Sequence, residues 1–271
     1  MADDFSPELI ERCLTGTFGR PLRFFDSIGS TNSEAMDWAL HGAPHGAVVT
    51  ADHQTEGRGR WGRSWFSKPG ALLQFSLVLR SDLEVDAHGI LTAALGVGVA
   101  RALERVTGLD TKVKWPNDVT VSGKKIVGML VETAVGGSRL EVAICGIGIN
   151  VYLERDDLPD EIRERASSLA IELAERSRGG APERAELLCA CLGEIETIYG
   201  SVIDPDAREL VIAAATERSE VLGKDVVVRL ADGKEIAGAA RSLDEEGALV
   251  LDGPDGRMIL HVGEIAQLRE A

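Results

Sequence analysis

The 271-residue sequence predicts an α+β fold, in which a mainly antiparallel sheet is flanked by helices and followed by a small all-β module. Strand-like runs between residues 112 and 151 are joined by tight glycine turns, which is typical of an antiparallel meander. Two helical stretches, residues 182–199 and 205–217, follow each other instead of alternating with strands. After Gly223 the pattern changes to short strands separated by turns, which indicates a second, all-β unit.

The N-terminal part begins with a predicted strand over residues 22–28. Residues 30–34 (STNSE) offer several side chains suited to capping a helix N-terminus. A short helix is expected over residues 35–40, and Gly42 follows it as a C′ glycine would. These features place a polar cluster between the first strand and the first helix of the sheet domain.

Two strands and a long helix are expected next. Residues 47–54 and 72–80 are rich in β-forming side chains and flank an arginine- and glycine-containing loop. Residues 86–106 show apolar helical periodicity and end before Gly108. Gly96 and Gly98 are poor helix formers, so we expect them to permit close packing against a sheet.

The meander comprises three predicted strands, residues 112–121, 126–135 and 139–151, with turns at Ser122-Gly123-Lys124 and Gly136-Gly137. The charged segment 156–165 is expected to be an exposed connector or a short helix. Pro182 is placed near the N1 position of the helix that follows.

The C-terminal module has turn signals at Asp232-Gly233, Glu246-Gly247 and Asp255-Gly256. This spacing predicts a small barrel of the SH3 type. We therefore divide the chain into an α+β domain, residues 1–219, and an SH3-like domain, residues 220–271.

Charge, apolar run length and cysteine spacing argue against several classes of function. The formal net charge of −15 argues against nonspecific binding to nucleic acid, which requires a cationic face. No apolar run reaches the length of a membrane helix, and the first 20 residues lack the order of a secretion signal, so we expect a cytoplasmic protein without a membrane partner. The cysteines show no metal-finger spacing and are expected to be buried, reduced small hydrophobes: Cys13, Cys145, Cys189 and Cys191.

Residues 57–63 read Gly-Arg-Gly-Arg-Trp-Gly-Arg, which is the most informative stretch. Arg58, Arg60 and Arg63 carry planar, permanently charged donors that suit carboxylates and phosphates. The glycines let backbone approach a ligand and permit positive φ. Because local and global charge have opposite signs, a small anionic ligand is favoured over a flexible surface loop or an arginine–glycine nucleic-acid tail.

A second cluster is Lys114-Trp115-Pro116-Asn117-Asp118. Pro116 breaks a strand, so Lys114 and Asn117-Asp118 should stand around a bend, although a plain bulge with a surface lysine is an alternative. Gly146-Ile-Gly-Ile-Asn150 lacks the third glycine and the following helix of a dinucleotide fingerprint. Its glycines more simply let a ligand or another backbone approach the strand. A P-loop motif is absent from the sequence.

These motifs together resemble the signature set of the biotin–protein ligases. The resemblance also includes Ser30-Thr31-Asn32, Gln54, the segment 123–132 and the C-terminal segment 263–269, and it covers nearly the whole chain. It implies an ATP-dependent ligase that makes biotinyl-5′-AMP and transfers biotin to a lysine of a biotin carboxyl carrier domain. Biotin and ATP would be the substrates and Mg²⁺ would accompany ATP, held mainly by phosphates.

The resemblance also implies residue roles. Lys114, Arg58 and Arg60 would be catalytic, with the lysine ammonium bridging the attacking carboxylate and the α-phosphate. The biotin site would be formed by Ser30, Thr31, Asn32, Gln54, Gly57, Arg58, Gly59, Arg60, Lys114 and Gly128. The ATP site would be formed by Arg60, Arg63, Trp65, Asn117, Asp118, Lys125, Asn150 and Arg269.

Three alternatives remain at this stage. A lipoate–protein ligase shares adenylate chemistry, and a biotin-responsive repressor would carry an N-terminal helix-turn-helix, for which about 21 residues before the first strand are too few. The third alternative is a non-catalytic biotin-binding or scaffold protein, but such a protein would not need a charged side chain at every position where the resemblance leads us to expect one. We expect the single-function enzyme, as a monomer or weak homodimer.

Overall fold

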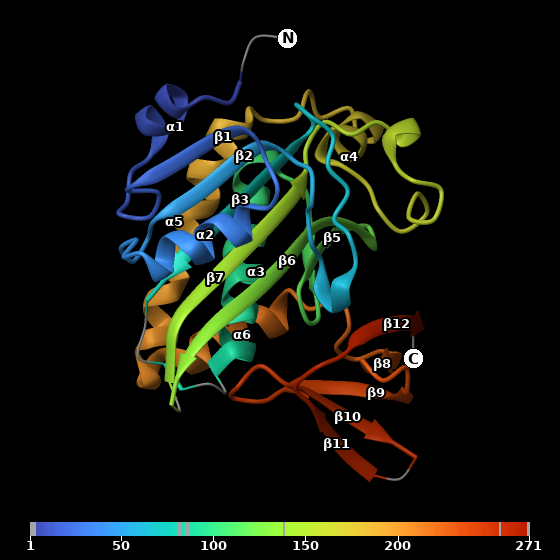
Figure 1. Ribbon diagram of the computed structural model, residues 1–271. Coiled ribbons are helices and arrows are strands. Elements are labelled where there is room, and N and C mark those ends of the chain that lie inside the picture. Colours follow the sequence, from blue (N-terminus) through green and yellow to red (C-terminus); the bar gives the residue numbers. More distant parts are fainter. Residues whose placement is uncertain (1–3, 81–82, 85–86, 138, 255, 270–271) are drawn as a thin grey trace.

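A large mixed sheet and a small antiparallel sheet make up the fold (Figure 1). The computed structural model describes residues 4–80, 83–84, 87–137, 139–254 and 256–269. The predicted α+β class is confirmed. No helix among these residues is both long enough and apolar enough to cross a membrane.

The large sheet has seven strands in the order β1-β2-β3-β7-β6-β5-β4. Only β1 and β2 pair in parallel, and the other pairs are antiparallel, as predicted. The strands are β1 (Leu22–Ile28), β2 (Val48–Gln54), β3 (Leu72–Leu79), β4 (Thr111–Lys114), β5 (Asp118–Val121), β6 (Lys124–Gly136) and β7 (Arg139–Asn150).

The meander contains four strands and not three. Residues 115–117 form a turn that divides the predicted run 112–121 into β4 and β5. Pro116 lies in this turn, where its missing N–H costs no ladder hydrogen bond. The bend predicted from Pro116 is thus a complete hairpin, and Lys114 is the last residue of β4.

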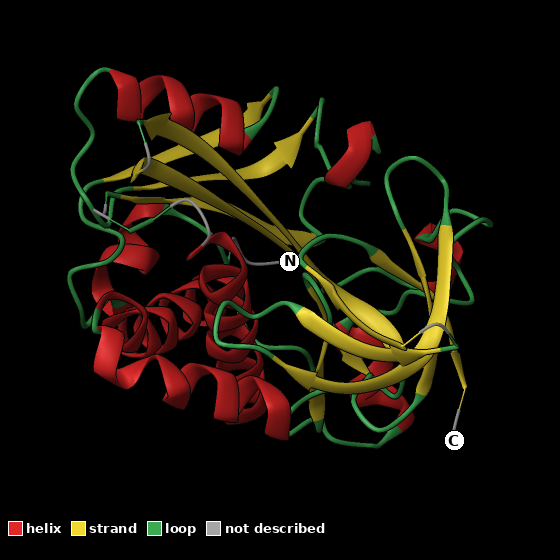
Figure 2. Cartoon of the chain, turned by 90° about the horizontal axis from the view of Figure 1, so that it is seen from below, coloured by secondary structure: helices red, strands yellow, loops and turns green. Residues whose placement is uncertain are grey.

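Helices cover the large sheet unevenly. Figures 1 and 2 show α2 on one face, while α3 and α5 lie on the other. A Cβ at Gly96 would lie 3.1 Å from Val113 on β4, so Gly96 packs against the sheet, as expected. A Cβ at Gly98 would lie 2.9 Å from Ile195, so Gly98 packs against the helix α5 and not against the sheet. The helices are α1 (Pro7–Cys13), α2 (Thr31–Leu40), α3 (His88–Thr107), α4 (Leu169–Glu175), α5 (Arg184–Ile203) and α6 (Arg208–Glu217), with 3-10 turns η1 (Arg60–Gly62), η3 (Arg155–Asp157) and η4 (Pro205–Ala207).

Helix boundaries correct the sequence interpretation in two places. α5 begins at Arg184 with Glu183 as its N-cap, so Pro182 precedes the cap and is not at N1. The short helices α1 and α4 were not predicted. Each spans seven residues and is capped by a serine side chain, Ser6 and Ser168, so a periodic apolar pattern has little length in which to appear.

Cys13 and Cys189 form a disulfide that joins α1 to α5, which makes the expectation of four reduced cysteines wrong for this pair. The two residues are 176 positions apart in the sequence, and only the packing of α1 against α5 brings them together. Cys145 and Cys191 are buried free thiols, as expected, and burial raises the pKa of both.

The C-terminal module is a five-stranded antiparallel sheet in the order β11-β10-β9-β8-β12. Gly233 and Gly247 have positive φ at two of the predicted turns; the third includes Asp255, which lies outside the described residues. The domain boundary after residue 219 falls between α6 and β8 and stays a prediction. The strands are β8 (Asp225–Arg229), β9 (Glu235–Leu243), β10 (Leu249–Gly253), β11 (Gly256–Leu260) and β12 (Glu264–Arg269).

Candidate active site

A cavity of about 1150 Å³ lies between the large sheet and the C-terminal module. Its walls come from the arginine–glycine loop, the start of α2, the β4–β5 turn, β6, β7 and the start of β12. It gathers almost every residue that the sequence singled out: Ser30, Thr31, Asn32, Gln54, Arg58, Gly59, Arg60, Arg63, Trp65, Lys114, Asn117, Asp118, Lys125, Gly128 and Asn150.

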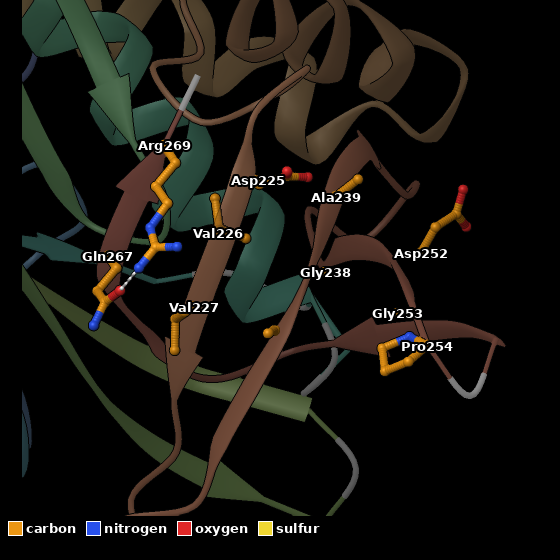
Figure 3. Close-up of a pocket in the computed structure, with 11 residues that line it drawn as sticks. Asp225, Val226, Val227, Gly238, Ala239, Asp252, Gly253, Pro254, Gln267 and Arg269 are labelled. Atoms are coloured by element: carbon orange, nitrogen blue, oxygen red, sulfur yellow. Dashed lines mark hydrogen bonds between the residues drawn. The ribbon is translucent and has the colours of Figure 1, made fainter. Parts of the chain in front are cut away.

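Gly57 and Arg269 do not line this cavity. Gly57 is buried behind the loop, where its carbonyl accepts a hydrogen bond from the Trp65 amide (2.8 Å) and a Cβ would lie 2.8 Å from the Trp65 carbonyl. Arg269 points along the outer face of the small sheet, where it donates to Gln267 Oε1 (3.1 Å; Figure 3). The structure therefore places Arg269 on a separate, shallow groove of the C-terminal module and not beside the predicted ATP site.

One side of the cavity, here called the neutral wall, is formed by Thr31, Asn32 and Gln54. Gln54 Oε1 accepts hydrogen bonds from the Thr31 amide (2.7 Å) and hydroxyl (3.1 Å). Behind them, the buried Ser76 hydroxyl lies 2.8 Å from Thr31 Oγ1 and 2.6 Å from Asn32 Oδ1. The neutral wall is thus a continuous hydrogen-bond network whose side-chain orientations are fixed by one another.

A glutamine behind the neutral wall fixes the Gln54 amide. Gln54 Nε2 donates to Gln74 Oε1 (2.9 Å), while Gln74 Nε2 donates to Ser67 Oγ (3.0 Å). Gln74 and Ser76 are fully buried on β3. With the nitrogen engaged by Gln74, the oxygen of Gln54 is oriented toward Thr31.

A second part of the cavity lining, here called the charged wall, includes five of the cations that line the cavity. Arg60 donates to the Gly263 carbonyl (2.8 Å) and to Asn117 Oδ1 (3.3 Å). Three of the other cations form ion pairs: Arg58 with Glu132 (3.2 Å), Arg63 with Glu264 (2.7 Å) and Lys125 with Asp118 (2.7 Å). The five cations are Arg58, Arg60, Arg63, Lys114 and Lys125.

The ionisation of these groups follows from their neighbours. Hydrogen bonding to Arg63 lowers the pKa of Glu264, and the same bonds raise the pKa of Arg63. Burial lowers the pKa of Arg60, but a guanidinium starts so high that it stays charged at neutral pH. The charged wall therefore holds fixed positive charges next to internal carboxylates.

Lys114 differs from its neighbours. It ends β4 opposite Asp118 and lines the cavity, yet no hydrogen bond or ion pair engages its ammonium within the described ranges. An ammonium without a protein partner at the edge of a cavity is available to an anionic ligand. This position fits the cation that the sequence placed at the reacting centre.

The Trp65 ring occupies space that two glycines leave free on β6 and β7. It packs against Gly128 and Gly148, where a Cβ would lie 2.7 Å and 2.6 Å from ring atoms, and Lys125 Nζ lies 5.4 Å from the ring centroid. Gly146 similarly makes room for Asn32. The close approach predicted for residues 146–150 is real, but two side chains make it, and not another backbone.

Asn117 and Asn150 are engaged by the protein backbone. Asn117 Nδ2 donates to the Met129 carbonyl (2.6 Å), and the buried Asn150 Nδ2 donates to the Ser167 carbonyl (2.8 Å). Asn117 therefore fixes the β4–β5 turn on β6 while its oxygen faces Arg60. Asn150 fixes the end of β7 at the edge of the cavity.

Sequence reasoning missed four contributors to the site: Gln74, Ser76, Glu132 and Glu264. The polar residues Gln74 and Ser76 alternate with apolar ones inside a strand that is buried throughout, which is a detectable signal. The two glutamates lie in the segments 123–132 and 263–269 of the family resemblance, but their pairing carries no such signal, since only the fold brings them to Arg58 and Arg63.

Known proteins resemble this chain in both of its parts. The chain matches the Biotin/lipoate A/B protein ligase family over residues 24–150 and the Biotin protein ligase C terminal domain over residues 221–266. It is 33% identical over 279 residues to the biotin--[acetyl-CoA-carboxylase] ligase of Mycobacterium tuberculosis, covering 98% of both chains. It is 34% identical to the bifunctional ligase/repressor BirA of Bacillus spizizenii, covering 93% of this chain and 75% of that protein.

The fold gives the same result. A biotin protein ligase from Aquifex aeolicus, solved in complex with biotin and ATP, superposes with a TM-score of 0.75 at 29% identity, covering 92% of this chain and 99% of that one. The fold and the two-part match place the chain in the class of biotin and lipoate protein ligases. Within that class, it belongs to the biotin protein ligase family.

Proposed function

We propose that the cavity activates biotin with ATP as biotinyl-5′-AMP and then transfers biotin to a lysine of a biotin carboxyl carrier domain. The observation that carries the proposal is the Lys114 ammonium, which has no partner among the described residues and lies in one cavity with the neutral wall and the other cations of the charged wall. The related ligase named for acetyl-CoA carboxylase supports the carrier as acceptor, and the relative solved with biotin and ATP supports the two small substrates.

In the first step, a biotin carboxylate oxygen forms a bond to the α-phosphorus of ATP, and the bond to pyrophosphate breaks. Lys114 contacts both the carboxylate and the α-phosphate and offsets the negative charge that they bring together. Arg58 and Arg60 contact the same groups, and Arg63 contacts the leaving pyrophosphate. Each guanidinium exchanges an internal carboxylate, amide or carbonyl partner for a ligand oxygen.

In the second step, the neutral ε-amine of the carrier lysine attacks the acyl carbon of the mixed anhydride. The C–N bond forms, the acyl–phosphate bond breaks, AMP leaves, and the amine releases a proton. The protein supplies position and charge, and Lys114 and Arg60 stabilise the departing phosphate.

The neutral wall selects the head group of the acid. Its hydroxyl and amide groups can exchange their mutual hydrogen bonds for those of a ureido ring, which offers two N–H donors and a carbonyl. A dithiolane ring offers none of these, so lipoate would gain no hydrogen bonds from Thr31, Asn32 and Gln54. This asymmetry favours biotin over the lipoate alternative.

The nucleotide occupies the side formed by Trp65, Asn117, Asp118 and Lys125, with Trp65 offering an aromatic face to adenine. Among the described residues, no cluster of three or more His, Cys, Asp or Glu side chains could hold a metal ion. Asp118 and Glu264 are already paired with cations. These residues fit a Mg²⁺ ion that is carried mainly by the triphosphate oxygens, where it would neutralise charge.

The direct test is incubation of the protein with ATP, Mg²⁺, biotin and a carrier domain, followed by intact mass spectrometry of the carrier. We expect the carrier to gain one biotinyl group only when all components are present, and lipoate to replace biotin poorly. Lipoylation as fast as biotinylation would overturn the choice of substrate. If neither a modified carrier nor biotinyl-5′-AMP forms, the proposal as a whole is overturned.

A further inference from the structure

Trp115 belongs to the core of the C-terminal module although it lies in the β4–β5 turn of the large domain. Its side chain is 8% exposed and packs in one hydrophobic cluster with Val221, Val226, Val228, Ala240, Leu249, Leu251 and Ile265. Its indole Nε1 donates to the Gly247 carbonyl (3.2 Å). The module is thus built around a ring that the other domain provides.

One glycine of the module lies against this ring, and a second, whose carbonyl accepts the indole hydrogen bond, lies against α3. A Cβ on Gly263 would lie 3.2 Å from Trp115 Cζ3, and Gly263 also presents the carbonyl to which Arg60 donates. Gly247 has φ +81°, and a Cβ there would lie 2.9 Å from the Gly89 carbonyl carbon at the start of α3. A residue larger than glycine at position 263 would therefore disturb the slot that holds Trp115, since it would meet both Val228 and the ring.

The residue on the other side of Lys114 is also held by the C-terminal part of the chain. Val113 donates its amide to the Arg218 carbonyl (2.8 Å) and accepts from the Glu220 amide (3.0 Å). The Glu220 carboxylate in turn accepts from Thr120 on β5 (2.8 Å). Lys114 consequently lies between two neighbours, Val113 and Trp115, that the connector and the module fix in place.

We propose that Trp115 is a positioning residue that lets the C-terminal module set the location of the Lys114 ammonium. This inference rests on the proposed role of Lys114 in adenylate formation. Lys114 has no side-chain partner of its own among the described residues, so its backbone anchors are what define its position. Effective catalysis depends on such placement, because a displacement of about 1 Å can cost about 100-fold in rate.

The experiment compares Trp115→Phe and Trp115→Leu with wild type for single-turnover synthesis of biotinyl-5′-AMP. Phenylalanine keeps an aromatic ring in the slot but loses the bond to Gly247, and leucine loses the ring. We expect the rate to fall about 10-fold and about 100-fold respectively, with KM for biotin within about threefold, because the neutral wall is untouched. Leu251→Val removes packing in the same core away from the turn, and at a matched loss of thermal stability it should keep the rate within about twofold of wild type.

A double-mutant cycle with Lys114→Ala separates positioning from general stability. If Trp115 acts through Lys114, Trp115→Phe should weaken binding of biotinyl-5′-AMP about fivefold in wild type and have little further effect in the Lys114→Ala background. Additive losses, or equal rate losses in Leu251→Val and Trp115→Phe, would overturn the inference while leaving the ligase function in place. A Lys114→Ala protein with normal adenylate synthesis would instead refute the role of Lys114 itself.

Discussion

The neutral wall and the charged wall of the cavity satisfy their polar groups in different ways. In the neutral wall, Thr31 bonds to Gln54, and the buried Ser76 connects Thr31 to Asn32. In the charged wall, the partners of Arg58, Arg63 and Lys125 are carboxylates from other strands, at side chains that remain partly exposed. The neutral wall is therefore preformed, whereas the charged wall consists of cations whose internal counter-ions a ligand can replace.

This difference predicts a division of labour between affinity and rate. Buried neutral networks discriminate by the penalty of leaving a donor or acceptor unpaired, which acts on ground-state binding. Fixed cations act most strongly where negative charge accumulates during the reaction. Substitutions in the two walls should therefore separate KM from kcat.

The largest effect should come from Lys114→Ala. We expect synthesis of biotinyl-5′-AMP to fall about 10³-fold, because the ammonium has no partner in the described part of the chain and meets the ligand without exchanging one. Pyrophosphate release measured in a single turnover reports this step directly. Circular dichroism and thermal unfolding should remain close to wild type, since the Lys114 side chain makes no hydrogen bond or ion pair with the described residues that would be lost. Near-normal synthesis of biotinyl-5′-AMP by Lys114→Ala would contradict the proposed catalytic role of Lys114.

Ser76→Ala tests the neutral wall and should have the next largest effect. The hydroxyl bonds to both Thr31 and Asn32 from a fully buried position, so its loss leaves two polar atoms less well satisfied. We expect KM for biotin to rise about 10-fold with kcat nearly unchanged. Ser242→Ala, on an exposed part of β9, is the matched control and should not change either parameter. A fall in kcat alone would contradict the proposed division.

The two walls also differ in how well the sequence predicts them. Arg58, Arg60, Arg63 and Lys114 lie in short motifs of uncommon residues, and their chemistry is readable without the fold. Their counter-ions are not, because Glu132 and Glu264 lie 74 and 201 positions from their partners. Charge pairing at such separations depends on strand order and domain placement, which no local pattern encodes.

The same limit applies to the fold. The strands and the longer helices follow from periodicity and glycine turns, and the boundaries of β1 agree with the prediction. Trp115 looked like part of a strand break, whereas it is a core residue of the C-terminal module. The Cys13–Cys189 disulfide similarly depends on two helices meeting across the chain. Local preferences define the elements, and long-range packing decides which side chains meet.

Glu132→Gln tests the idea of an exchangeable counter-ion. The amide keeps an acceptor for Asn32, while Arg58 loses its ionic partner and can meet the biotin carboxylate without giving one up. Both side chains of the pair are partly exposed, so the pair is worth at most about 1 kcal/mol, and we expect biotin to bind about two- to fivefold more tightly by titration calorimetry. Glu11→Gln removes the same charge from α1, far from the cavity, and should leave affinity unchanged. Weaker binding by Glu132→Gln would show that Glu132 supports the site and does not compete with the ligand.

Glu264→Gln should have the smallest effect and concerns stability. Glu264 and Arg63 link the C-terminal module to the arginine–glycine loop through two hydrogen bonds, but the arginine is half-exposed, so solvent screening limits the pair to about 1 kcal/mol or less.

Hydrogen bonding to Arg63 lowers the pKa of Glu264 below its ordinary 4.5 in the folded state. A lowered folded-state pKa means that this stabilisation is present above the unfolded value and is lost as the pH falls through the folded one. The difference in unfolding free energy between wild type and Glu264→Gln should therefore be constant near neutral pH and vanish in acid, once the pH has fallen below the lowered folded-state pKa. Denaturant titrations at pH 7 and in acid measure it, and a difference that persists unchanged in acid would assign the effect to packing and not to the ion pair.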